Sequence, residues 1–152
     1  PSLVDGPPRT SGHYPDRQKA PATVGPTGES DMARGYMGKI LNVDLTNRTT
    51  SDEPLDEDLC RKYIGGYGLG ARILYDRMGA GVDALGPDNL LGFFPGPLTG
   101  SPSIEGNRFV VVCKSPLTDT WGDANCGGTF GPKLKAAGYD GVVFSGIAST
   151  PV

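Results

Sequence analysis

The sequence has little of several features that mark large functional classes. Lys and Arg total 14 against 17 Asp and Glu, a net charge of -3, so the basic surface of a general nucleic-acid-binding protein is missing. No run reaches the roughly 18 to 20 apolar residues of a membrane span, and the N-terminus lacks the apolar core of a signal peptide. These absences predict a soluble cytoplasmic protein that binds neither nucleic acid nor a membrane.

Histidine and cysteine are also scarce. The single histidine, His13, lies in a Pro/Gly-rich N-terminal segment, so the rest of the chain has no imidazole for a general base, a catalytic triad or a His-containing zinc site. Acid-base chemistry would fall to carboxylates, Lys or Tyr. The cysteines Cys60, Cys113 and Cys126 are odd in number and far apart, which excludes a disulfide framework or a CxxC motif and predicts buried free thiols.

Glycine and proline, by contrast, are abundant: 24 and 14 residues, about a quarter of the 152-residue chain. Residues 1–31 hold six Pro and four Gly but only three of Leu, Ile, Val or Phe. So little apolar surface does not offset a backbone entropy cost of roughly 1 to 2 kcal/mol per residue. We therefore expect 1–31 to be a disordered Pro/Gly-rich extension and 32–152 to be one domain, or part of one.

The rest of the chain, residues 32–152 (the body), alternates predicted strands with short helices. Residues 39–45 alternate apolar and polar side chains, which is typical of a half-buried strand, and a turn at 46–48 would return the chain as a hairpin partner at 49–53. Further strands are predicted at 90–94, 108–113 and 141–145, and helices at 56–64, 69–78 and 130–137. The opening hairpin favours an α+β fold with mixed β-sheets and short helices over a parallel doubly wound sheet.

Two glycine-rich stretches are candidates for phosphate-binding loops. Residues 66–71 satisfy G-x-G-x-x-A, but the dinucleotide fingerprint follows a strand, and here a helix precedes it, which favours a turn between two helices. Residues 123–132 lead into the third predicted helix, where small residues and free N–H groups favour an anion. Arg108, at the start of a strand, would suit a phosphate as a bidentate partner. The alternative is a capped helix with a surface salt bridge.

Short runs stand in order along the body: GKIL at 38–41, DLT at 44–46, YIGG at 63–66, GLGA at 68–71, GPLTG at 96–100, KSPLT at 114–118, FGPKLK at 130–135 and AGYD at 137–140. Together they resemble the N-terminal domain of the tungsten-containing aldehyde ferredoxin oxidoreductases. The resemblance spans nearly all of 35–152, and its specificity lies in the ordered set rather than in any one run.

The resemblance implies a function for the full-length protein: oxidation of aldehydes to carboxylic acids, with electrons passing through a [4Fe-4S] cluster to ferredoxin. The family holds tungsten by the dithiolenes of two pterins (tungstopterin), whose phosphates magnesium bridges, and its N-terminal domain is the platform for these pterins. By this resemblance, 32–152 is a partial N-terminal pterin-binding domain. The cluster ligands and the acid-base residues would lie beyond position 152, so the fragment alone would be inactive.

The resemblance also assigns site residues. Arg108 matches the arginine that contacts a pterin, and Asn125 and Gly127 match the family's Asn-x-Gly contact. The backbone carbonyl of Asn125 would in addition bind magnesium, a metal that prefers hard oxygen ligands.

Two alternatives stay open. One is an active-site subunit of another tungsten or molybdenum oxidoreductase of the same superfamily, of the benzoyl-coenzyme A reductase type. The other is a non-catalytic module that binds a pterin or a partner. The expected partners are an aldehyde, ferredoxin, and either a second copy of the protein or electron-transfer subunits.

Overall fold

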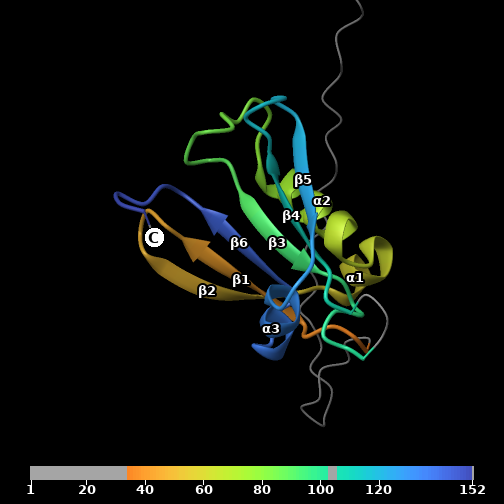
Figure 1. The fold of residues 1–152 in the computed structure, drawn as a ribbon. Coiled ribbons are helices and arrows are strands. Elements are labelled where there is room, and N and C mark those ends of the chain that lie inside the picture. Colours follow the sequence, from red (N-terminus) through yellow and green to blue (C-terminus); the bar gives the residue numbers. More distant parts are fainter. Residues whose placement is uncertain (1–33, 103–105, 152) are drawn as a thin grey trace, which may run out of the picture.

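A six-stranded mixed sheet forms the centre of the computed structural model, which describes residues 34–102 and 106–151 (Figure 1). The predicted extension at 1–31 lies outside the described residues. In chain order the elements are β1 (Lys39–Asp44), β2 (Thr49–Pro54), α1 (Glu57–Tyr63), α2 (Gly66–Arg77), β3 (Leu91–Pro95), β4 (Phe109–Lys114), β5 (Trp121–Cys126), α3 (Phe130–Ala136) and β6 (Gly141–Ser145).

The strand order is β2-β1-β6-β3-β4-β5. β1 and β2 form the predicted antiparallel hairpin, whose turn is closed by a hydrogen bond of 3.0 Å from the Asn47 amide to Oδ1 of Asp44. β6 pairs parallel with β1 and antiparallel with β3, and so joins this hairpin to the antiparallel run β3-β4-β5. The α+β class with a mixed sheet is therefore confirmed.

The hydrophobic core lies between one face of the sheet and α2, with α1 packed beside α2 (Figure 1). Leu69 and Leu74 of α2 face Phe94 and Val112 of the sheet, and all four side chains are buried. Burying one such side chain contributes roughly 1.5 to 3 kcal/mol. α3 lies at the end of the sheet and contacts β3. None of the helices in the described ranges is long and apolar enough to cross a lipid bilayer.

Most predicted elements are present, but the strand β5 was missed. Its sequence, WGDANC, contains no β-branched residue and includes Gly, Asp and Asn, which are depleted in strands. It is a strand because each of its six residues pairs with β4. The glycine-rich stretch at 123–132, for which no strand was predicted, therefore begins inside a strand.

The other glycine-rich stretch belongs to a helix. α2 begins at Gly66, three residues before the predicted start, and follows α1 directly. The G-x-G-x-x-A run at 66–71 thus lies after a helix rather than a strand, which excludes the dinucleotide fingerprint and confirms the junction between two helices.

The three cysteines are free thiols, as predicted, but only Cys60 is fully buried; Cys113 and Cys126 are half-buried. Burial, assisted by the negative charges of Asp140 and Asp56, raises the pKa of Cys60 to about 11. This thiol therefore stays protonated at neutral pH.

Candidate functional site

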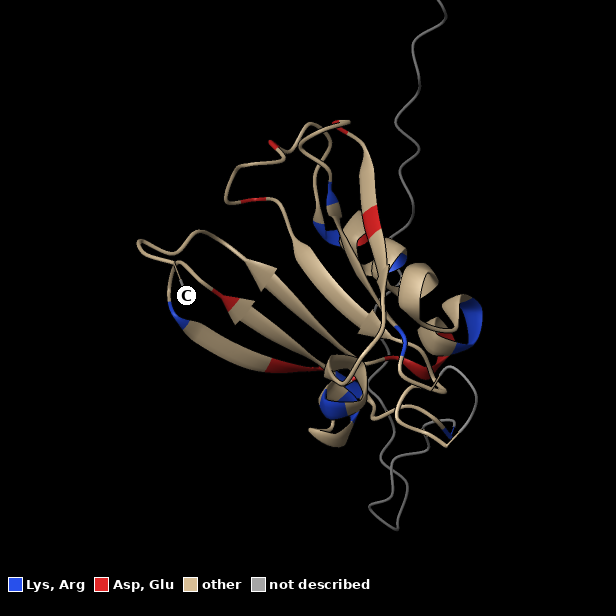
Figure 2. Cartoon of the chain, in the orientation of Figure 1, with Lys and Arg blue, Asp and Glu red and all other residues tan. Residues whose placement is uncertain are grey.

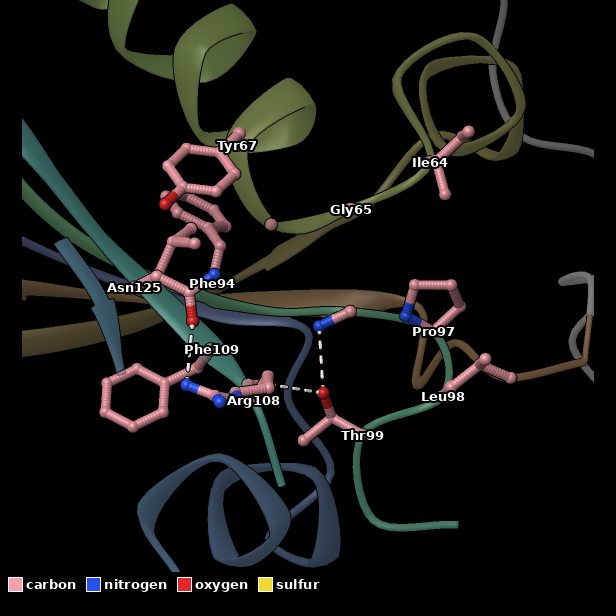
Figure 3. Close-up of a pocket in the computed structure, with 13 residues that line it drawn as sticks. Ile64, Gly65, Tyr67, Phe94, Pro97, Leu98, Thr99, Arg108, Phe109 and Asn125 are labelled. Atoms are coloured by element: carbon pink, nitrogen blue, oxygen red, sulfur yellow. Dashed lines mark hydrogen bonds between the residues drawn. The ribbon is translucent and has the colours of Figure 1, made fainter. Parts of the chain in front are cut away.

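A pocket of about 440 Å³ opens where the α1–α2 junction meets the turn after β3 (Figure 3). The junction supplies one wall, the turn supplies a second, and β4 and β5 form the floor. The lining residues are Ile64, Gly65, Gly66, Tyr67, Phe94, Gly96, Pro97, Leu98, Thr99, Arg108, Phe109, Val110 and Asn125.

Thr99 anchors the turn after β3 to the start of β4. Its Oγ1 accepts a hydrogen bond of 3.0 Å from the Gly96 amide and donates one of 2.6 Å to the backbone carbonyl of Arg108 (Figure 3). Only 6% of the residue is exposed. It also packs on α3, because a Cβ at Gly131 would lie 3.0 Å from Cγ2 of Thr99. Thr99 thereby fixes where Arg108 enters the pocket.

The three residues predicted to bind cofactor lie together. Nη1 of Arg108 donates to Oδ1 of Asn125 at 3.4 Å, and both side chains line the pocket (Figure 3). Val110 pairs with Asn125 in the β4–β5 ladder, and this register brings Asn125 close to Arg108. Gly127 lies two residues after Asn125, and a Cβ there would lie 3.9 Å from Nη1 of Arg108. The structure thus brings together an arginine, an amide and a glycine from two chain segments.

The junction wall contains an unusual turn at Ile64. Its φ of 64° and ψ of -65° at the end of α1, with a hydrogen bond of 2.7 Å from the Gly65 amide to the Tyr63 carbonyl, define the rare γ-turn with positive φ at its centre. A β-branched residue at positive φ is a conformational outlier, and such strain concentrates at ligand sites. The hydroxyl of Tyr36 donates to the Ile64 carbonyl and supports the turn from outside the pocket.

Glycine is required where the two walls touch. A Cβ at Gly65 would lie 3.0 Å from Cδ of Pro97 and 3.3 Å from Cα of Gly96, so a larger residue would push the walls apart. At Gly68, a Cβ would lie 2.3 Å from the carbonyl oxygen of Tyr63. Gly65 and Gly68 therefore allow close packing against neighbouring backbone.

The composition of the lining suits ligand binding. The described lining residues include one guanidinium, one carboxamide, one buried hydroxyl and the phenol of Tyr67 among apolar and aromatic side chains, and no Asp, Glu, His, Cys or Lys. A guanidinium at the mouth of a largely apolar pocket suits a ligand that combines an anionic group with a flat ring. Basic residues also occupy the last turns of α1 and α3 (Figure 2).

Comparison with known proteins decides the family. The model of the aldehyde ferredoxin oxidoreductase N-terminal domain matches residues 40–152. The chain belongs to this family. The aldehyde ferredoxin oxidoreductase assignment agrees with the resemblance carried by the ordered sequence runs.

Relatives of known name cover more than one activity. The chain is 44% identical over 118 residues to a tungsten-containing aldehyde ferredoxin oxidoreductase of Pyrococcus abyssi, a match that covers 78% of this chain and 19% of the relative. It is 42% identical over 120 residues to the WOR-like subunit of an aliphatic sulfonate oxidoreductase of Pyrococcus furiosus, with 77% and 19% covered. The chain thus spans about one fifth of the length of these relatives.

A solved structure shows the same fold. The active-site complex BamBC of benzoyl coenzyme A reductase, determined with 1,5-dienoyl-CoA, superimposes with a TM-score of 0.75 at 37% identity. The match covers 78% of this chain and 18% of the other. The described part of this chain and the matching part of that complex therefore share the α+β architecture.

Thr99 and Ile64, the residues that shape the two walls of the pocket, were not singled out from the sequence. Thr99 had a local signal, since a Pro-initiated turn with a threonine follows the predicted strand at 90–94. Ile64 had none, because an isoleucine at positive φ contradicts its own preference.

Proposed function

We propose that this chain forms part of the platform that binds the tungsten bis-pterin of an oxidoreductase. That enzyme would oxidise aldehydes to carboxylic acids and pass the electrons through a [4Fe-4S] cluster to ferredoxin. The observation that carries the proposal is that Arg108 and Asn125 line one pocket, with Gly127 beside Arg108, in a member of this family. The tungsten and the aldehyde are inferred from relatives such as the tungsten-containing aldehyde ferredoxin oxidoreductase of Pyrococcus abyssi.

The chain's own residues would bind and orient the cofactor. When bound, the tungsten-pterin group supplies the two-electron redox chemistry. Arg108 would pair with a pterin phosphate, Gly127 would leave room for close approach to the backbone, and the carbonyl of Asn125 would bind the magnesium. We place the cluster ligands and the proton-transfer groups outside this chain.

The test is cofactor content of Arg108→Ala in the full-length protein, purified anaerobically. Loss of a charge-assisted contact worth roughly 1.5 to 3 kcal/mol predicts retention of tungsten and pterin roughly ten- to a hundredfold weaker. Metal analysis and pterin fluorescence measure both. Arg61→Ala is the matched control, because Arg61 pairs with Glu57 on the exposed side of α1. Full tungsten and pterin content in Arg108→Ala would contradict the assigned role.

A second candidate is favoured by the structural match to BamBC, a benzoyl coenzyme A reductase. Both enzymes would share the cofactor platform, so substrate turnover separates them. The tungsten-loaded protein would be assayed with an aldehyde and oxidised viologen, and with an aromatic coenzyme A thioester and reduced viologen. Protein that carries neither metal nor pterin would instead favour a non-catalytic binding module.

A further inference from the structure

A buried ion pair between Lys135 and Asp140 lies outside the pocket lining. Nζ of Lys135, near the end of α3, is 2.5 Å from Oδ1 of Asp140, just before β6, and the two side chains are only 6% and 3% exposed. Removing two charges from water is costly unless other hydrogen bonds satisfy them. The remaining contacts of this pair therefore indicate what it holds in place.

Those contacts go to one segment, residues 35–38, which we call the strap. Nζ of Lys135 donates to the Gly35 carbonyl at 2.5 Å. Oδ2 of Asp140 accepts from the amides of Met37 and Gly38, each at 2.7 Å. The strap has no regular secondary structure and leads directly into β1. The ion pair thus bonds the strap through three backbone groups.

The strap in turn contacts both walls of the pocket. Gly35, at a φ of +99°, packs on the turn after β3 so closely that a Cβ there would lie 2.8 Å from the Pro97 carbonyl oxygen. The hydroxyl of Tyr36 donates to the Ile64 carbonyl at the end of α1 and lies 3.4 Å from the Cys60 carbonyl oxygen. Burial and the nearby Cys60 and Asp140 raise the pKa of Tyr36, so the phenol remains a donor.

Tyr36 also contacts the ion pair directly, because the centroid of its ring lies 5.6 Å from Nζ of Lys135. One residue therefore contacts the ammonium group and the strained turn at Ile64. Gly35 thus connects the ion pair to the turn after β3, and Tyr36 connects it to the α1–α2 junction.

We infer that Lys135 and Asp140 are positioning residues for the pocket: by holding the strap they set the place of Ile64 against Pro97. Neither side chain lines the pocket. The inference rests on the proposed function for its ligand, since a pocket that takes a pterin phosphate needs its walls at a constant separation. It adds a set of residues remote from Arg108 that controls cofactor retention.

The test uses the full-length protein with Asp140→Leu, which removes the acceptor of both strap amides, and with Lys135→Met. Native-state hydrogen exchange is read at the Gly65 and Gly96 amides, which bond to Tyr63 and to Thr99 in the two walls. We expect exchange there to become about tenfold faster or more, while the central strand residue Val112 keeps its protection. Tungsten and pterin content should fall together with this loss of protection.

Two further variants make the experiment decisive. Asp76→Asn is the control, because Asp76 pairs with Arg72 at 2.7 Å on the exposed side of α2. Where a single variant leaves an uncompensated buried charge and does not fold, Lys135→Met combined with Asp140→Leu removes both charges while still deleting the bonds to the strap.

The outcomes separate the two proposals. Unchanged exchange at Gly65 and Gly96, or raised exchange with undiminished pterin content, would overturn the positioning role and leave the proposed function standing. If the unsubstituted protein holds no pterin, yet exchange rises only at the pocket walls of the variants, the proposed function fails and the positioning role stands.

Discussion

Ile64 shows how a single residue can be held against its own preference. Among the described residues, Arg48, Ile64 and Asp119 are the non-glycine residues at positive φ. Arg48 and Asp119 lie in exposed turns, whereas Ile64 is β-branched and lines the pocket. The hydrogen bond from Tyr36 and the close contact of Gly65 with Pro97 hold the turn that follows α1. Its conformation is therefore a product of the surrounding structure.

Replacing Ile64 by glycine should stabilise the protein. Relief of positive-φ strain, about 1 to 3 kcal/mol, exceeds the added entropy of an unfolded glycine, about 0.4 to 1 kcal/mol, so a net gain of about 1 kcal/mol is expected. The lost side chain contributes little packing, because Ile64 is 63% exposed. Urea unfolding measures the change. Ile64→Ala removes the same side chain but keeps a Cβ, and an equal gain in that variant would refute strain relief.

Among the helices, α1 is the one that local sequence explains best. Asp56 caps it by accepting a hydrogen bond of 2.8 Å from the Asp58 amide. Acidic residues occupy its first turn and basic residues its last, which is the arrangement that the helix dipole favours. Glu57 and Arg61 form an ion pair of 2.6 Å one turn apart. All of these interactions lie within a few residues of one another, so a sequence pattern predicts them.

Loss of the cap should destabilise α1 in a measurable way. Asp56→Ala deletes the acceptor for the Asp58 amide, and we expect a loss of about 1 kcal/mol in the free energy of unfolding. Circular dichroism during urea titration measures it. Asp56→Asn keeps a capping oxygen and should stay close to the unsubstituted protein. An equal loss in both variants would point to charge rather than capping.

The molecule as a whole is packed around Phe94. Its ring occupies space that only glycines leave open on three elements: a Cβ at Gly70 of α2, Gly92 of β3 or Gly141 of β6 would lie 2.9, 2.5 or 2.6 Å from ring atoms. The ring is completely buried. One side chain therefore determines how closely the helix and two neighbouring strands approach one another.

This packing predicts a coupled pair of substitutions. Gly141→Ala should lower the free energy of unfolding by about 1 to 3 kcal/mol, because the methyl group and the Phe94 ring compete for the same space. Phe94→Leu vacates part of that space, so the double variant should lose less than the sum of the single losses, by at least about 0.5 kcal/mol. A chemical-denaturation cycle over the four proteins measures the coupling. Strict additivity would refute the shared-space explanation.

Local signals predicted most strands and the ends of α1 and α3 but not the start of α2, and the ordered sequence runs predicted the family. The alternation at 39–45, the cap at Asp56 and the stop after Tyr63 are interactions between near neighbours, which composition and spacing record. Arg108, Asn125 and Gly127 were identified through resemblance, and their role in cofactor binding stays a prediction.

The sequence by itself thus determined the local elements, the α+β class and the family. Only the tertiary structure decided that 121–126 is a strand, that β6 lies between β1 and β3, and that the strap reaches both pocket walls. The physical reason is the same in each case. These features depend on pairing and packing between residues far apart in the chain, where the gain from contact outweighs the local preference of WGDANC or of Ile64.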